Sequence, residues 1–251
     1  VPRRLALAPG VTSSLGAFGI LSGMVFPILM FPACILHALA DLLIPEIARC
    51  TAAGSTSRIR YLTGRCLGAA LIYGLIFGGG MFLISEDLCW SLYKSETAGT
   101  VLKQYSLLIP MLYCDSLVDA MTKGAGQQKV CVRYNIITSA MDVVGLYFLL
   151  PRLGMQGYFI SFLITHLINF LLSLRRLLFI TGMTLHWNRI GLCVFSALIC
   201  VSISSAAPGA MVRIITYPLL LFTALWVFGI IDKHELHWFF QAFFPAKKTA
   251  S

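Results

Sequence analysis

The sequence predicts an all-α polytopic membrane protein with about seven transmembrane helices. Hydrophobic residues make up 58% of its 251 residues and charged residues 12%, whereas charged residues are about 25% of an ordinary soluble protein. The mean hydropathy is +0.84. The apolar residues lie in long runs between short basic or Gly/Pro-rich joints, which is typical of membrane-spanning helices. The runs lack the alternation of barrel strands.

Seven apolar segments are long enough to cross the membrane, since a span needs roughly 20 residues for about 30 Å of hydrocarbon. They are Gly16–Leu43, Thr63–Ile84, Leu102–Thr122, Val132–Leu150, Gly157–Leu174, Ile190–Ala206 and Ile214–Ile231. Pro27 and Pro32 predict a kink in the first, because each proline removes a backbone donor. Two shorter segments, Glu86–Tyr93 and His234–Phe244, are expected to lie at the membrane interface.

The loops predict the orientation of the chain, since Lys and Arg are enriched in cytoplasmic loops. One set of alternating loops holds thirteen cations: Arg49, Arg58, Arg60, Arg65, Lys123, Lys129, Arg133, Arg175, Arg176, Arg189, Lys233, Lys247 and Lys248. The other set holds six. The thirteen predict a multi-pass membrane protein whose C-terminus is cytoplasmic. No soluble segment is long enough for a nucleic-acid-binding module, so the net charge of +9 does not indicate a nucleic-acid partner.

Ionisable residues inside the predicted spans are candidates for function, because a charge in hydrocarbon is costly. Asp115, Asp119 and Lys123 follow one another at intervals of four and share a helix face. Asp119 and Lys123 have the acid-before-base spacing of an i,i+4 ion pair. Asn135 and Asp142 are seven apart on the next span and also share a face. We expect these five residues to line a polar cavity or to couple an ion, with a purely structural role as the alternative.

Other motifs argue against an enzyme or a metalloprotein. The eight cysteines form no Cys-x-x-Cys pair, and no Gly-x-Ser-x-Gly sequence is present. His234 and His237 are three apart, whereas a zincin needs two histidines four apart. The sequence therefore predicts no catalytic residue, no metal and no cofactor. His166 and Asn169 are expected to make an interhelical hydrogen bond.

The order of several short motifs resembles the C-terminal lobe of polysaccharide and lipid-linked-oligosaccharide flippases of the multidrug/oligosaccharidyl-lipid/polysaccharide (MOP) exporter superfamily. Stage V sporulation B-like proteins and lipid II flippases are the most similar branch. The matching segments lie within residues 1–182: Val1–Leu5, Gly19–Pro27, Leu29–Pro32, Leu43–Ala48, Asp115–Gln128, Asn135–Ile137, Leu149–Gly154 and Gly157–Tyr158.

The resemblance implies the C-terminal half of a two-lobe transporter of the MATE/MOP type. Residues 1–182 would be flippase helices after a truncated preceding helix, 183–232 two additional transmembrane helices, and 233–251 an interfacial cytoplasmic tail. The implied partners are a lipid-linked saccharide substrate, membrane lipids and an N-terminal lobe of the same protein. Transport would be by alternating access, with Asp115 and Asp142 as candidate ion sites.

Two other functions stay open at this point. One is a MATE-type multidrug/cation antiporter, which shares the lobe architecture. The other is a non-transporting scaffold subunit of cell-envelope assembly, since a single lobe need not transport.

Overall fold

The computed structural model describes residues 14–230, and within this range the chain is helical with no strand. This confirms the predicted all-α class. The chain divides into two compact units, residues 1–185 and 186–251. The expected interfacial tail at 233–251 lies outside the described residues.

Several of the described helices can cross a membrane. Five are long and apolar enough by themselves, and a bent pair makes a sixth. The five are Thr56–Tyr93, Ile109–Leu153, Met155–Thr181, Trp187–Ser205 and Ala210–Val227. They indicate a multi-pass membrane protein.

The first expected span is broken. It consists of α1 (Ser14–Ile20), a π-helical turn η2 (Leu21–Val25), α2 (Phe26–Met30) and α3 (Ala33–Ala52). The segments before and after Phe31 and Pro32 are bent by 61°, which confirms the predicted kink. Pro27 lies in the first turn of α2, where a missing N–H costs little.

Helix α4 runs without interruption from Thr56 to Tyr93. Its 38 residues extend about 57 Å at 1.5 Å per residue. The expectation of a separate interfacial helix at Glu86–Tyr93 is therefore wrong, because this segment is the last part of α4. Ser85 and Cys89 are buried where α4 packs against α5, so this end of the helix has a packing partner.

The third expected span is divided in two. Helix α5 (Glu96–Ser106) starts at Ser95, whose side chain accepts a hydrogen bond from the amide of Ala98, as an N-cap does. A turn at residues 107–108 separates it from α6 (Ile109–Thr122). Helix α6 packs closely on α4, since a Cβ at Gly74 would lie 2.7 Å from Pro110 Cα.

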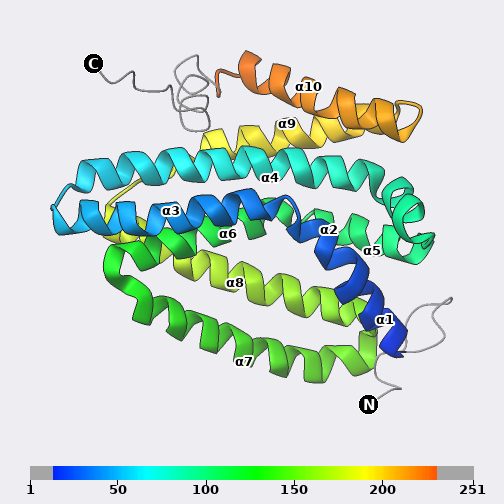
Figure 1. Cartoon of the computed structure of the whole chain (residues 1–251), viewed down its shortest axis with the longest axis horizontal. Helices are drawn as coiled ribbons and strands as arrows, with labels where there is room; N and C mark the ends of the chain where they lie inside the picture. The colour runs from blue at the N-terminus through cyan, green and yellow to red at the C-terminus, as the bar shows by residue number, and fades with distance from the viewer. Residues whose placement is uncertain (1–13, 231–251) are drawn as a thin grey trace, which may run out of the picture. The chain divides into compact units, whose positions relative to one another are not determined.

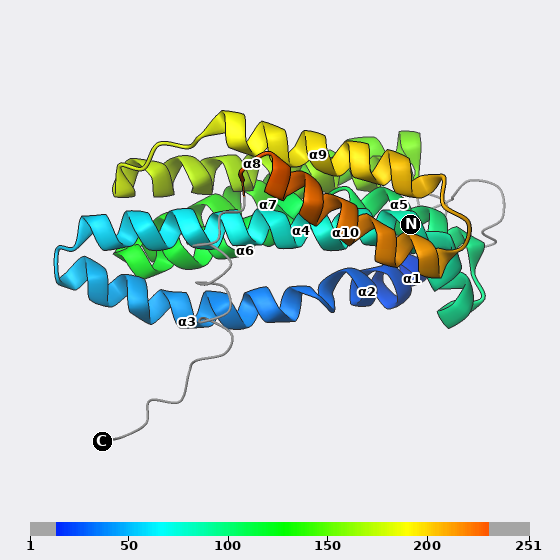
Figure 2. The ribbon, with the colours of Figure 1, turned by 90° about the horizontal axis from the view of Figure 1, so that it is seen from above.

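The next two helices form a hairpin. A turn at η3 (Lys123–Gln127), where Gly126 has φ +77°, leads from α6 into α7 (Gln128–Leu153). Gly154 with φ +59° then reverses the chain into α8 (Met155–Thr181). Both α6 and α7 pack against α8, and α6 also packs against α3. Figures 1 and 2 show these helices running lengthwise through the first unit.

The two ends of the described first unit differ in charge. One end combines the α3–α4 turn, η3 and the C-terminal end of α8 (Figure 1), and its loops and helix ends carry Arg49, Arg58, Arg60, Lys123, Lys129, Arg175 and Arg176. Arg49 and Arg58 both pair with Glu46. The Arg60 Nε–H donates to the carbonyl of Thr181 at 2.6 Å and so caps the last turn of α8. The opposite end carries Lys94, Lys103 and Arg152.

The second unit contains an antiparallel helical hairpin. Helix α9 (Trp187–Ser205) and helix α10 (Ala210–Val227) are joined by a short turn at Gly209. The buried face of α9 holds small residues, Cys193, Ser196, Ala197, Cys200 and Ser204. Small side chains let two membrane helices approach closely, and α10 contributes Tyr217, Leu221 and Leu225 to the buried surface.

Candidate functional site

The Asp142 carboxylate of α7 is hydrogen-bonded by two hydroxyl groups of α8. Its Oδ1 accepts from Ser161 Oγ at 2.7 Å and, more weakly, from Thr165 Oγ1 at 3.3 Å. The Thr165 hydroxyl shares its proton with the nearer carbonyl of Ser161, at 2.9 Å. Gly145, one turn further along α7, allows this approach, because a Cβ there would lie 2.6 Å from Ser161 Oγ. The fold thus places an acid between two apolar helices and supplies it with neutral donors.

The Asp115 carboxylate of α6 faces α8 from the other side. The amide side chain of Asn169 lies close to it. Oδ1 of Asp115 and Oδ1 of Asn169 are nevertheless buried without a hydrogen-bond partner among the described residues. Nδ1 of His166 likewise has no hydrogen-bond partner among the described residues, and the His166 ring packs on Phe162 with 4.1 Å between the ring centroids. The interhelical hydrogen bond expected of His166 and Asn169 stays a prediction.

A line of polar side chains on α8 connects the two acids. Ser161, Thr165 and Asn169 are spaced four residues apart, so they lie on one face of the helix. We call these three residues the polar ladder. It extends about 12 Å along the helix at 1.5 Å per residue, from the carboxylate of Asp142 to that of Asp115.

Neither Asp115 nor Asp142 has a cationic partner within the described part of the chain, where the ion pairs involve Glu46, Glu86 and Asp119. Burying an unpaired charge is costly, and in membrane proteins such acids mark ion or substrate pathways. The carboxylate, hydroxyl and amide oxygens here are hard donors, which suit a proton or a hard cation. No group of three His, Cys, Asp or Glu side chains suited to a metal occurs among the described residues.

The remaining sequence-predicted residues lie apart from the ladder. Asp119 and Lys123 form the ion pair that their spacing predicts, with 2.6 Å between Oδ2 and Nζ. This pair lies at the junction of α6 and η3. Asn135 is exposed on α7, and Asp142 lies seven residues further along the same helix. The structure therefore gathers Asp115 and Asp142 around α8 and leaves Asn135 outside that cluster.

The two hydroxyl residues of the ladder are not among the residues predicted from the sequence. A signal was present, because Ser161 and Thr165 stand four apart in an apolar helix and precede Asn169 by the same interval. Such a period could have predicted a polar face on α8. It could not have predicted that this face meets α7 on one side and α6 on the other.

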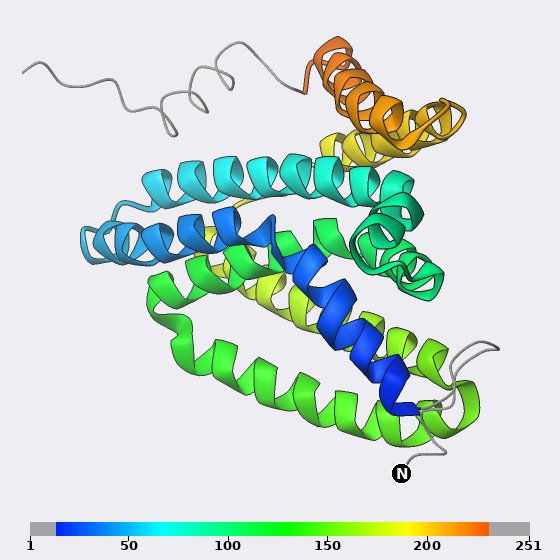
Figure 3. The same cartoon turned by 45° about the vertical axis from the view of Figure 1, so that its right-hand side comes forward.

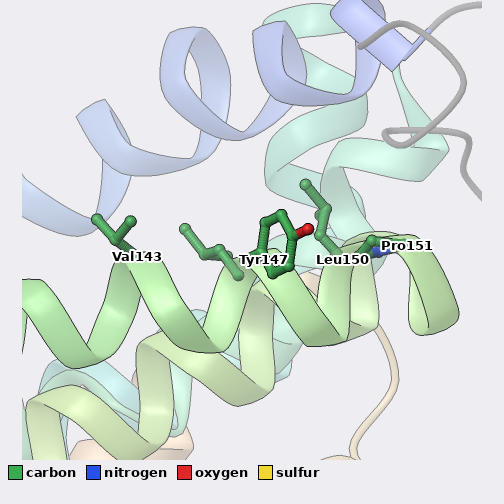
Figure 4. Close-up of a pocket in the computed structure, with 5 residues that line it drawn as sticks. Val143, Tyr147, Leu150 and Pro151 are labelled. Atoms are coloured by element: carbon green, nitrogen blue, oxygen red, sulfur yellow. The ribbon is translucent and has the colours of Figure 1, made fainter.

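An apolar depression lies on α7, on the face lined by Val143, Leu146, Tyr147, Leu150 and Pro151. Figure 4 shows these side chains along one side of the helix. Its lining is apolar apart from the hydroxyl of Tyr147 and offers no set of polar groups for a sugar or a phosphate. The polar ladder is therefore the stronger candidate site.

The fold and the ladder together define a class: a multi-pass α-helical membrane protein that holds two acids between its apolar helices, without a cationic partner in residues 14–230. The chain matches no protein-family model, and no curated protein or solved structure is significantly similar to it.

Proposed function

We propose that the chain is the C-terminal lobe of a membrane flippase that exports lipid-linked oligosaccharide or polysaccharide precursors. The observation that carries the proposal is the pair of acids, Asp115 and Asp142, held against the polar ladder inside membrane-crossing helices. The ordered motifs that resemble the MOP exporters supply the substrate class. Seven spans would be present if α6 and α7 each cross the membrane.

The proposed mechanism is alternating access between two lobes. A polyprenyl-diphosphate-linked sugar would keep its charged head in a polar cavity while its chain stays in lipid. This avoids moving a hydrated charge through hydrocarbon. The N-terminal lobe would supply the groups that grip the diphosphate, and the basic end of the described first unit would face the cytoplasm.

In this scheme the ladder is the coupling site. Binding of a proton or a sodium ion neutralises Asp115 or Asp142, and release to the other side restores the charge. Each acid has neutral neighbours, so the local charge changes from −1 to zero when a cation binds. A change of this kind can shift the equilibrium between the two states of a transporter. The Asp119–Lys123 pair is already neutral as a unit and would line the cavity at the end of α6.

A strain depleted of the whole protein tests the function. The proposal predicts that depletion makes a lipid-linked saccharide precursor accumulate in the membrane. Wild-type protein should clear the precursor, and the variant carrying both Asp115→Asn and Asp142→Asn should not. Asp87→Asn is the matched control, because Asp87 is an exposed acid at the end of α4. Clearance by the double variant at the wild-type rate would overturn the role of the acids, and no accumulation on depletion would overturn the flippase.

A multidrug/cation antiporter is the second candidate, and one observation favours it. An aromatic cluster adjoins the ladder: the ring centroid of Phe162 lies 5.7 Å from that of Tyr105 and 5.8 Å from that of Phe26. Aromatic faces attract organic cations. The same depletion strain separates the two functions. An antiporter predicts sensitivity to organic cations and retention of a fluorescent cationic dye, with lipid-linked precursors at their normal level.

A further inference from the structure

The break in the first span has the features of a hinge. The helix is interrupted at Phe31 and Pro32 with a bend of 61°. Pro32 has no backbone N–H, so it cannot donate the i→i−4 hydrogen bond of a regular helix. A π-helical turn lies only a few residues upstream, at Leu21–Val25. Such irregular turns are frequent where helices change direction or move.

Two tyrosine hydroxyls from neighbouring helices hold the two sides of this break. Tyr113 of α6, which is 2% exposed, donates to the carbonyl of Leu29 at 2.8 Å. Tyr73 of α4 donates to the carbonyl of Pro32, also at 2.8 Å. The two hydroxyls therefore tie α6 and α4 to the backbone on either side of the break.

The segment before the break reaches across to α8. Figure 3 shows α1 and α2 leaving the line of α3 and running toward the ends of α7 and α8. We call Ser14–Met30 the arm. Phe26 of the arm contacts Tyr105 and Phe162, with ring distances of 5.9 and 5.8 Å, and Phe18 lies 6.5 Å from Tyr158.

These contacts put the arm beside the polar ladder. Phe162 follows Ser161 directly in α8, and its ring lies against His166, which follows Thr165. The arm contacts α8 through aromatic rings, and each aromatic pair contributes only about 0.5–1.5 kcal/mol beyond its buried area. Separating the arm from α8 therefore breaks no ion pair among the described residues.

We propose that the arm swings about Phe31–Pro32 as a gate beside the polar ladder, and that the Tyr73 and Tyr113 hydroxyls hold its closed position. The gate controls access from one side of the membrane to the acids. The identity of what passes rests on the proposed function, whereas the hinge motion itself does not.

Hydrogen exchange of the full-length protein tests the hinge without any transport measurement. Tyr113→Phe and Tyr73→Phe each remove one hydroxyl and keep the ring. One lost hydrogen bond predicts roughly a two- to tenfold rise in exchange for amides 26–36. Peptides from residues 66–84 of α4 should be unchanged, and so should every peptide in Tyr61→Phe, since Tyr61 is exposed. Unchanged exchange at 26–36, or an equal rise in both regions, overturns the hinge.

A reversible tether tests the gate. Cysteines at Phe18 and Tyr158 join the arm to α8. Cysteines at Gly78 and Ile109, whose Cβ atoms would lie 3.5 Å apart, join α4 to α6 as the control. Cys34 is replaced because it is the exposed thiol among the described cysteines. We expect the first tether to stop precursor clearance until a reductant is added, and the second to allow it. Clearance with the arm tethered overturns the gate.

Failure of the proposed function and failure of the hinge give different results. If the untethered parent clears no lipid-linked precursor, the proposed function fails, and the exchange experiment still decides whether the hinge exists.

Discussion

Gly145→Ala tests the close contact between α7 and α8 on which the candidate site depends. The added Cβ would lie 2.6 Å from Ser161 Oγ, which is several tenths of an ångström inside van der Waals contact. Ser161 can rotate away, but it then loses its 2.7 Å hydrogen bond to Asp142. Alternatively α7 and α8 move apart and lose packing.

The expected loss in the free energy of unfolding follows from these two routes. A hydrogen bond to a charged group contributes about 1.5–3 kcal/mol, and overpacking of a tight contact costs about 1–3 kcal/mol. The higher helix propensity of alanine returns about 1 kcal/mol. We therefore expect a net loss of about 0.5–2 kcal/mol in the free energy of unfolding, measured by thermal or denaturant unfolding in detergent.

Gly68→Ala is the control, because a Cβ at this position of α4 meets no atom within 4 Å. It should leave stability unchanged or raise it by up to about 1 kcal/mol. The double variant Gly145→Ala with Ser161→Ala removes the clashing hydroxyl, so its loss should be smaller than the sum of the two single losses. The reasoning is refuted if Gly145→Ala is as stable as Gly68→Ala, or if the double variant shows simple additivity.

Three further predictions concern stability and transport. Gly157→Ala should destabilise by about 1–3 kcal/mol in the same unfolding assay, because its Cβ would lie 2.5 Å from the carbonyl oxygen of Leu149 and backbone cannot rotate away; equal stability would contradict the hairpin geometry. Arg60→Gln should cost about 0.5–1.5 kcal/mol through the lost bond to Thr181, while Arg58→Gln, exposed beside Glu46, should cost less than about 0.5 kcal/mol; the reverse order would refute the cap. Asp115→Asn should raise the thermal midpoint, since it removes an unpaired buried charge, and should lower precursor clearance; a fall in both would indicate a structural acid.

Much of the fold follows from the sequence, because hydrophobic runs and prolines act locally. The predicted apolar segments are helical along most of their described length, with turns at 31–32 and 107–108, and Pro32 marks the bend. The errors arose where tertiary packing decides. Glu86–Tyr93 continues α4 because α5 covers Ser85 and Cys89. Residues 107–108 divide the third expected span because Pro110 begins a new helix against Gly74.

The candidate site was predictable only in part. A buried acid in an apolar run is visible in the sequence, so Asp115, Asp119 and Asp142 could be named. The partners of an acid depend on how each helix is rotated about its axis, and no single sequence specifies that rotation. The sequence therefore paired Asn135 with Asp142 on one helix, whereas the structure brings Ser161 and Thr165 from α8.

The most direct measurement is flipping of a fluorescent polyprenyl-diphosphate-linked saccharide in proteoliposomes that contain the whole purified protein. A quencher that cannot cross the bilayer reports the fraction of label left inside. The account predicts flipping that requires a proton or sodium gradient, that Asp87→Asn retains and that Asp115→Asn with Asp142→Asn abolishes. Flipping by the double variant at the wild-type rate would contradict the account, as would wild-type protein that moves no lipid-linked saccharide under any gradient.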